Sequence, residues 1–346
     1  MNYKNNGTKW EQALASRENP WNKNSNNLLT QYVLIENNTI YNSWGEGIDL
    51  LYCEFCIVRN NTIKNAFGEL VYIDNSRNCI VENNFLYVTT NDYNYQLWKR
   101  RAHGIGFSSE NYLNINTTNI TIRNNLILGV CCGITHINYE GYYDEIHIVH
   151  NTLINIQQYG IFIHPTKNIS SVKNNEISNN VIAGSFVCYN EEEFKKWKGF
   201  SNVWVDNEIN FSVLDDYSGY ENTSIIINKM YNESLYPSTN ENCFDIEKYL
   251  PRCIDEIKKD DIYGNVLIGK GIKSDFSNGM DYFNNKRNVK KPSIGFAEYC
   301  TINGGDNESQ KNNKNSIFLV IILIVAGIIV SVIIALLIYI IIKKKF

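Results

Sequence analysis

A six-residue phrase recurs along the first half of the chain and limits what the chain can fold into. The phrase is an aliphatic residue, any residue, Asn-Asn or His-Asn, any residue, and a second aliphatic residue. It reads IENNTI, VRNNTI, VENNFL, IRNNLI, IVHNTL and ISNNVI, starting at Ile35, Val58, Val81, Ile122, Ile148 and Ile177. The second polar residue advances from Asn38 to Asn180 in steps of 23, 23, 41, 26 and 29 residues. A near-constant period with insertions predicts a solenoid.

Within each phrase aliphatic and polar residues alternate with a period of two, which is the period of a β-strand. A second apolar strand recurs at GIDL, LVYID, HGIGF, CGITHI and YGIFIHP. Two or more strands per coil, joined by bends, wind into a parallel β-helix in which each coil pairs with the next. We expect the Asn residues to stack at a bend, because Asn tolerates left-handed backbone and its amide can bond the Asn one coil away. The predicted fold class is all-β.

Two observations limit the alternatives. The chain is rich in Asn throughout, so one Asn-Asn pair says little, but six pairs in phase with aliphatic flanks indicate a repeat. Leucine-rich repeats are the nearest rival, and their Leu spacing and helical half are missing.

The net charge of −4 provides no basic surface for nucleic acid, so we expect no nucleic-acid partner. We expect a monomer.

The far end of the chain predicts a single transmembrane α-helix. Residues 317–342 are 26 residues without a charge, followed by Lys343, Lys344 and Lys345. At about 1.5 Å per residue such a helix crosses a bilayer core of about 30 Å. The lysines favour a cytoplasmic C-terminus, with the solenoid extracellular or luminal.

The N-terminus does not match that orientation, because MNYKNNGTKW has no apolar signal segment. Two explanations stay open. The chain is the C-terminal part of a longer precursor whose signal and first coils are missing, or it is a tail-anchored protein with a cytosolic solenoid. Sequons favour the first, and the glycosylation candidates are Asn116, Asn119, Asn168, Asn210, Asn222 and Asn232. Asn37 and Asn60 also lie in sequons, but we place them in the bend ladder, where a glycan does not fit easily.

Nine cysteines fit the same orientation. Cys53 and Cys56 form a CxxC, but no second CxxC or His pair lies at zinc-ligand spacing, so we expect no metal site and favour stacked core cysteines or a local bridge. Cys243 and Cys253 are the disulfide candidate, because a bridge in that irregular region would close a loop.

The chain divides into six stretches. Residues 1–30 are an N-terminal cap or truncated coil, in which WEQALASRE could form a short helix. The remaining stretches are regular coils over 31–187, an irregular extension with a closing segment over 188–306, a polar stalk over 307–316, the transmembrane helix over 317–342 and a basic tail over 343–346.

The phased repeats, with RRAHGIGFSSEN, IRNNLILGVCCGI and DEIHIVHNTL, resemble the right-handed parallel β-helix repeats of the pectate-lyase-like superfamily, in the form found in microbial secreted or surface proteins. The resemblance implies a right-handed helix. SDFSNGMDYFNNKRNVKKPSIGFAEYC is similar to a segment that ends the helix in many such proteins, with a pattern carried here by Asp281, Arg287, Pro292, Ile294, Gly295 and Glu298. The fold hosts lyases, hydrolases, epimerases and proteins without catalysis, so the likeness does not settle activity.

A β-helix offers rows of outward side chains about 4.8 Å apart, which suit an extended polymer such as a polysaccharide. If Ile48, Ile73, Ile105, Ile134 and Ile161 point inward, then Asp49, Asp74, Thr135 and Phe162 point outward. Candidate substrate-binding residues on that face are Asp49, Asp74, Glu110, His136 and His164.

Uronate elimination needs a base and a cation that neutralises the developing charge. The resemblance to β-helix lyases makes Arg100, Arg101 and His103 the catalytic candidates, with Asp49 and Asp74 as Ca²⁺ ligands if the protein is a lyase, and otherwise no cofactor. Hydrolysis would need two facing carboxyl groups, which Asp49 and Asp74 provide only if adjacent coils align them. The hypothesis is a membrane-anchored surface protein that binds a glycan, and the alternative is a tethered polysaccharide lyase or, with less support, a glycoside hydrolase.

Overall fold

The computed structural model describes residues 13–17, 29–89, 101–110, 115–137, 141–154, 156–183, 185–188, 190–206, 225–228 and 271–295. The chain divides into two units, residues 1–299 and 300–346, and every described residue belongs to the first. Within the described residues no helix is long and apolar enough to cross a membrane. The predicted transmembrane helix, the polar stalk and the Cys243–Cys253 disulfide lie outside the described residues.

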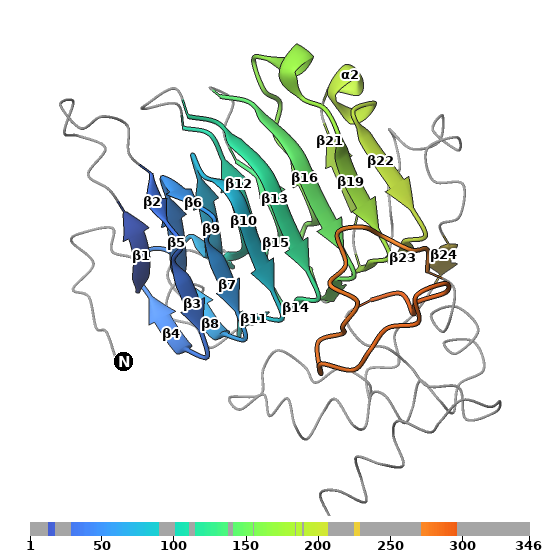
Figure 1. The fold of residues 1–346 in the computed structure, drawn as a ribbon, viewed down its shortest axis with the longest axis horizontal. Helices are drawn as coiled ribbons and strands as arrows, with labels where there is room; N and C mark the ends of the chain where they lie inside the picture. The colour runs from blue at the N-terminus through green and yellow to red at the C-terminus, as the bar shows by residue number, and fades with distance from the viewer. Residues whose placement is uncertain are drawn as a thin grey trace, which may run out of the picture. The chain divides into compact units, whose positions relative to one another are not determined.

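Three parallel sheets form the solenoid, and each successive coil adds a strand to each sheet (Figure 1). Sheet A contains β1 (Leu14–Arg17), β5 (Ile48–Leu51), β9 (Glu69–Asp74), β12 (His103–Ser108), β15 (Cys132–His136), β18 (Tyr159–Ile163) and β21 (Ser185–Cys188). Sheet B contains β2 (Thr30–Gln31), β3 (Leu34–Glu36), β6 (Cys53–Glu54), β7 (Ile57–Arg59), β10 (Arg77–Glu82), β13 (Thr117–Arg123), β16 (Tyr143–Val149), β19 (Asn175–Ser178) and β22 (Trp197–Phe200). Sheet C contains β4 (Thr39–Ser43), β8 (Thr62–Ala66), β11 (Phe85–Tyr87), β14 (Leu126–Leu128), β17 (Thr152–Ile154), β20 (Val181–Ala183), β23 (Val203–Asp206) and β24 (Ile225–Asn228).

The helical content of the described chain is small, namely a 3-10 turn at Ile169–Ser171 and the short helix α2 at Glu191–Phe194. β1 lies where the sequence suggested a short helix. Its backbone pairs in parallel with β5, and the N–H groups of Ala13 and Leu14 donate to the carbonyls of Glu46 and Gly47. This segment is therefore part of a coil, because the open edge of sheet A provides the hydrogen bonds that a helix would otherwise make internally. Parallel pairing also continues beyond residue 187, through β22 and β23 to β24.

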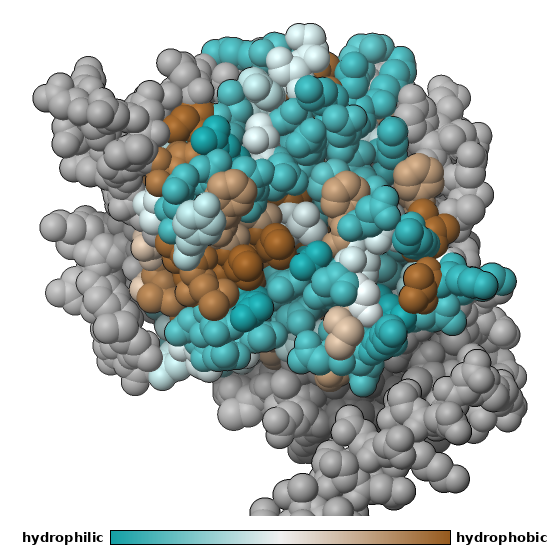
Figure 2. Space-filling view, viewed as in Figure 1, coloured by the Kyte–Doolittle hydropathy of each residue, from teal (hydrophilic) through white to brown (hydrophobic). Residues whose placement is uncertain are grey.

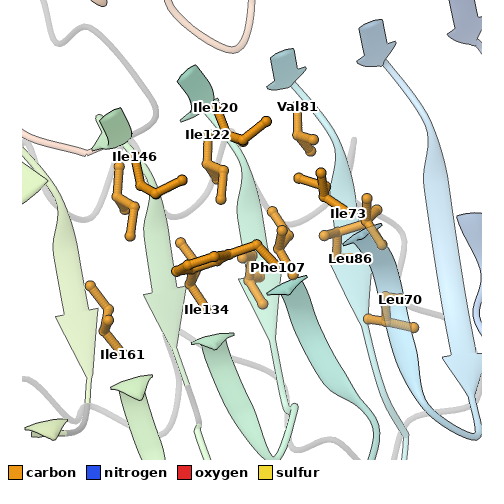
Figure 3. Close-up of a cluster of buried hydrophobic side chains, with 14 of the residues drawn as sticks. Leu70, Ile73, Val81, Leu86, Phe107, Ile120, Ile122, Ile134, Ile146 and Ile161 are labelled. Carbon is orange, nitrogen blue, oxygen red and sulfur yellow. The ribbon is translucent and has the colours of Figure 1, made fainter. Parts of the chain in front are cut away.

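The core is a stack of aliphatic side chains from all three sheets. Figure 3 shows Ile73, Phe107 and Ile134 from sheet A meeting Ile120 and Ile146 from sheet B in the shared interior. Each coil buries its own set, so the apolar area grows with every turn. Gly133 is required by this packing, because a Cβ there would lie 2.4 Å from Cδ2 of Leu153 and 2.5 Å from the carbonyl oxygen of Gly160.

The two polar residues of each repeated phrase have separate roles. The first adopts a left-handed backbone, with φ between 49° and 57°, in a column made by Asn37, Asn60, Asn83, Asn124, His150, Asn179 and Ser201. The second forms the hydrogen-bonded ladder, made by Asn38, Asn61, Asn84, Asn125, Asn151, Asn180 and Asn202. Asn37 and Asn60 have exposed side chains and belong to the left-handed column, so placing them in the bend ladder was wrong. The two polar residues of each phrase are consecutive at the bend and their side chains point in different directions, so they form two separate columns.

Each ladder Asn makes the same contacts. Oδ1 of Asn84 accepts from the backbone N–H and the side-chain Nδ2 of Asn61, both at 3.0 Å. Its own Nδ2 donates to the carbonyl of Val58 and to Oδ1 of Asn125, both at 3.0 Å. A buried amide that is fully hydrogen-bonded stabilises one register, since any other register leaves several polar groups unpaired.

The closing segment, residues 271–295, lies along the side of the later coils (Figure 1, orange). Arg287 is buried and donates to Oδ1 of Asn124 at 2.9 Å and to the carbonyls of Gly295, Ser293 and Met280. Asn179, from the same left-handed column as Asn124, exchanges two hydrogen bonds with the backbone of Ile272 at 2.8 Å. The described part of this segment therefore contacts the column of left-handed residues and does not cover the last coil.

The closing segment also changes the environment of two histidines. His147 stacks on Phe276 with ring centroids 3.3 Å apart and is buried. His150 is fully buried next to Arg287, and burial followed by that positive charge lowers its pKa well below the usual value. Both residues have a structural role at this contact.

The ladder gives a direct test of the fold. Asn84→Ala removes the acceptor for Asn61 and the donor for Val58 and Asn125, and each buried group left unpaired costs about 1–3 kcal/mol, so we expect a loss of at least about 3 kcal/mol in the free energy of unfolding. Asn60→Gly is the matched control, because glycine adopts the left-handed backbone easily and the Asn60 side chain is exposed, and we expect a change within about 1 kcal/mol. Urea unfolding followed by circular dichroism measures both. Equal losses would contradict the division of roles.

Candidate functional site

The outer face of sheet A carries several carboxyl groups and a phenol. In β5, β9 and β12 the residues of the core cluster alternate with Asp49, Tyr72 and Asp74, Gly106 and Ser108, which therefore face away from the interior. In each strand the alternation is interrupted once, where two consecutive residues both face inward. Gly104 faces inward as well as Ile105, because a Cβ on Gly104 would lie 2.7 Å from Cγ2 of Ile127. By the same alternation His103, just before Gly104, faces outward.

Three acidic or phenolic groups meet on this face. The Tyr72 hydroxyl donates to Oε1 of Glu110 at 2.8 Å, and the backbone N–H of Glu110 donates to Oδ1 of Asp74 at 3.1 Å. That N–H also donates to Oδ1 of Asn75 at 3.0 Å. Asp74 is only 1 % exposed, whereas Glu110 is half-buried and reachable from solvent. We call Tyr72, Asp74 and Glu110 the acidic cluster.

Ionisation of the cluster is strongly perturbed. Burial raises the pKa of Asp74 well above its usual value, and the nearby carboxylates of Glu110 and Asp49 raise it further, while hydrogen bonds from the backbone of Glu110 and Asn75 act in the opposite direction. Burial, Asp74 and Glu110 likewise raise the pKa of Tyr72. Asp74 is therefore a carboxyl group held toward its protonated form, which is the state of a hydrogen-bond donor or general acid.

Asp49 and Asp74 are not aligned. The register pairs Asp49 with Tyr72 and Asp74 with Leu51, so the two aspartates are diagonal neighbours in adjacent coils. With strands about 4.8 Å apart and a rise of about 3.3 Å per residue, their Cα atoms are about 8 Å apart. The two aspartates therefore do not lie directly opposite each other, as the hydrolysis alternative required, but diagonally.

The three predicted catalytic residues lie at the start of β12 or outside the described chain. Arg101 and His103 are half-buried at this corner, and Arg101 donates to the carbonyl of Gly129 at 3.2 Å. His103 pairs with Glu69 of the preceding coil. Arg100 lies outside the described residues. The structure thus places Arg101 and His103 on sheet A, one strand-length away from Asp74.

The two other predicted histidines differ in position. His136 pairs with Phe107 and Ile163, is fully buried and has its Nδ1 2.7 Å from the carbonyl oxygen of His164. Burial lowers the pKa of His136 to about 3, so it is a neutral core residue and does not lie on the outer face as expected. Ile134 faces inward and Thr135 outward, so the alternation along β15 returns His136 to the interior. His164 is half-buried at the end of β18, 6.3 Å from the ring of Phe162.

Sequence reasoning missed Glu46, Glu69 and Tyr72. Glu46 and Glu69 are buried and directly precede Gly47 and Leu70, the first inward residues of β5 and β9. Tyr72 was hidden within the apolar run LVYID. The 23-residue step of the repeat aligns Glu46 with Glu69 and Asp49 with Tyr72, and this spacing is the signal that could have found them.

Two cysteine groups have the composition of metal sites. Cys53, Cys56 and Cys79 lie close together in the core, and Cys53–Cys56 is a disulfide with a Cα–Cα distance of 6.2 Å, which confirms the local bridge. The second group is His103, Cys131 and Cys132, whose possible ligand atoms all lie within 4.8 Å of one another. The expectation of no metal site therefore needs to be reconsidered at this second group.

A separate apolar patch lies on the outer face of sheet B. Figure 2 shows hydrophobic residues gathered over β3, β7 and β10. Leu34, Ile57 and Ile80 follow one another in register there, beside the stacked rings of Tyr32 and Phe55, which are 73 % and 43 % exposed. The patch offers contact area but no carboxyl, imidazole or thiol group, so we place the candidate chemistry on sheet A.

Three glycosylation candidates fall in the described chain. Asn119 is exposed, with its Nδ2 2.7 Å from Oδ1 of Asn78, and Asn168 is exposed beside Ser170. Asn116 is half-buried and accepts from the backbone of Tyr142 at 3.3 Å. Asn210, Asn222 and Asn232 lie outside the described residues. The glycosylation of all six stays a prediction.

The raised pKa of Asp74 predicts that replacing this carboxyl group stabilises the protein more at high pH than at low pH. The folded protein holds a proton on Asp74 that the unfolded chain releases above about pH 4, so the contribution of this group to the free energy of unfolding falls as pH rises from about 4 toward the folded pKa. Asp74→Asn cannot ionise and keeps an acceptor for Glu110. We expect its melting temperature to exceed that of the wild type at pH 8, with a smaller difference at pH 4, by scanning calorimetry. If Asp74→Asn lowered the melting temperature equally at both pH values, the result would contradict the prediction that ionisation of Asp74 destabilises the folded protein.

Comparison with known proteins supports the fold. The chain has no match among curated proteins. Among solved structures it is similar to a mannuronic acid specific polysaccharide family 6 lyase enzyme from human gut microbiota, with 12% sequence identity, a TM-score of 0.23, and coverage of 65% of this chain and 77% of the other. So low a TM-score supports no argument from that enzyme's activity. The family described as "Right handed beta helix region" matches residues 23–210. This chain is therefore a member of the right-handed β-helix family.

Proposed function

We propose that the protein binds a polysaccharide along the outer face of sheet A, with Tyr72, Asp74 and Glu110 as the centre of the site. The observation that carries the proposal is the acidic cluster, in which a buried carboxyl is held toward its protonated form next to a carboxylate and a phenol. Buried polar groups of this kind are costly for stability and are typical of binding and catalytic sites. Such groups donate and accept hydrogen bonds in the pattern that sugar hydroxyls require.

The repeat favours a polymer over a small ligand. Outward positions recur once per coil about 4.8 Å apart. The column that contains Tyr72 continues in register through Asp49 on one side and through Gly106, Thr135 and Phe162 on the other. Phe162 stacks on Tyr159 with ring centroids 5.2 Å apart, and an aromatic ring is a favourable surface for a sugar face. The polymer would lie across the coils.

Charge on this face favours an uncharged glycan. The carboxyl groups of Glu46, Asp49, Glu69, Asp74 and Glu110 outnumber the cationic candidates Arg101 and His103. A polyuronate would be repelled unless a bound cation such as Ca²⁺ bridged the two sets of carboxylates. Elimination on a uronate, with Arg101 or His103 as the base, is therefore the less favoured chemistry.

Hydrolysis is the second candidate function. Asp74 has the raised pKa of a general acid, and Asp49 is a second carboxyl group in the adjacent coil. Inverting glycosidases use two carboxyl groups with space for a water molecule between them, and Asp49 and Asp74 provide two carboxyl groups set diagonally in adjacent coils. In this reading Asp74 would protonate the leaving oxygen and Asp49 would activate water.

Glycan binding by the full chain in detergent tests the proposal. We expect a neutral polysaccharide to bind the wild type, and Asp74→Asn and Tyr72→Phe to weaken binding by about tenfold, which corresponds to about 1.4 kcal/mol. Glu36→Gln, on the outer face of sheet B, is the matched control and should bind as the wild type does. Isothermal titration calorimetry measures the affinities. If the wild type bound no glycan in a panel of neutral and uronate polymers, or if Glu36→Gln weakened binding as much as Asp74→Asn, the site would be wrong.

Product analysis of the same panel separates binding from catalysis. New reducing ends without ultraviolet absorbance would indicate hydrolysis. Absorbance of an unsaturated product, with or without added Ca²⁺, would indicate elimination. Binding without either product would favour a surface-binding protein.

We further propose that residues 317–342 anchor the chain in a membrane, on the basis of their 26 uncharged residues and the lysines that follow. The full chain should stay in the membrane pellet after alkaline carbonate extraction, and a chain that stops at residue 306 should be released. Release of the full chain would contradict the anchor. An endoglycosidase mobility shift distinguishes an extracellular or luminal solenoid from a cytosolic one.

A further inference from the structure

We propose that His103, Cys131 and Cys132 form a binding site for a single Zn²⁺ ion or a similar soft divalent metal. The site lies at the corner where the strands of sheet A begin, and it is independent of the proposed glycan binding. It uses one imidazole and two thiols, which is a ligand set that occurs in zinc enzymes with one open coordination position.

The register of sheet A brings these residues together from adjacent coils. Ile105 pairs with Ile134, and the backbone N–H of Cys131 donates to the carbonyl of Ala102 at 2.8 Å. This pairing sets Cys131 and Cys132 directly beside Ala102 and His103. The parallel ladder fixes the backbone on both sides of the site, so the ligands are held in place before a metal binds.

A bend at Cys131 explains how two consecutive cysteines can serve one ion. Neighbouring residues of a regular strand point to opposite faces, which would separate the two thiols. Cys131 lies in a bend before β15, and Cys132 is the first residue of that strand. The bend turns both Sγ atoms toward the same point, since they lie within 4.8 Å of each other and of a ring nitrogen of His103.

These separations are close to those of a tetrahedral site. Zn–S bonds of about 2.3 Å and Zn–N bonds of about 2.0 Å place ligand atoms about 3.5–3.8 Å apart in a tetrahedron. Rotation of the side chains by a small amount closes that difference. Both cysteines are buried and His103 is half-buried, so the ion would be held by the protein on one side and open to water on the side of His103.

The sulfur content and burial favour a soft metal. Thiolate and imidazole ligands select zinc, cobalt or copper over Mg²⁺ and Ca²⁺, which prefer oxygen.

Cobalt serves as a visible probe for the site. We expect the full chain in detergent, titrated with Co²⁺ under non-reducing conditions, to bind one equivalent and to show thiolate-to-cobalt charge-transfer absorption in the near ultraviolet with the visible bands of a tetrahedral ion. Zn²⁺ should remove both signals by displacement. Cys132→Ser should reduce the charge-transfer band to roughly half, since one of two thiolates is lost, and should weaken Co²⁺ affinity at least about tenfold.

Three further variants keep the test decisive. Cys188→Ala is the matched control, because the Cys188 thiol is also buried but lies outside the group formed by His103, Cys131 and Cys132. Its spectrum should equal that of the wild type. His103→Cys replaces the imidazole by a third thiolate and should restore a tetrahedral spectrum with a stronger charge-transfer band, whereas His103→Ala should lose affinity. The proposal is overturned if the wild type shows no charge-transfer band, as it would if Cys131 and Cys132 were joined to each other, or if Cys132→Ser leaves the band unchanged.

Discussion

The hydrogen bond between an Asn side chain in one coil and the Asn of the preceding coil is the interaction on which the rest of the structure depends. From Asn61 to Asn202 each Oδ1 accepts from both the backbone and the side chain of its neighbour, in a place that water does not reach over most of the ladder. Aliphatic packing provides the larger free energy, but it is nearly indifferent to small shifts along the helix axis. The ladder is directional, so it fixes which residue of one coil lies beside which residue of the next.

That fixed register creates the outer face of sheet A. Because insertions are confined to the bends, the outward positions stay in line even where the repeat lengthens from 23 to 41 residues. Tyr72, Asp74 and Glu110 can therefore hold an unfavourable arrangement of buried acids, since the scaffold around them is over-determined. His103 meets Cys131 and Cys132 for the same reason. Two chemically different groups thus occupy neighbouring parts of one sheet.

The sequence predicted the coils well, because phased Asn-Asn pairs with aliphatic flanks report directly on stacking. It predicted the outer face only in part. Asp49 and Asp74 lie on the same face of sheet A, but the 23-residue step between their coils pairs Asp49 with Tyr72 and so sets the two aspartates diagonally. His136 was placed on the outer face although the alternation from Ile134 turns it inward, and the burial of His147 depends on Phe276, more than a hundred residues away. Long-range contacts of this kind leave no local pattern.

Native-state hydrogen exchange of the ladder tests the central claim most directly. Backbone amides of Asn61, Asn84, Asn125 and Asn151 donate to a side-chain oxygen of the next coil, outside the strand pairing. The account predicts that these amides exchange as slowly as the most protected strand amides and only through global unfolding. Exchange near the rate of an unfolded peptide, while neighbouring strand amides stay protected, would show that the side-chain ladder does not hold the coils in register.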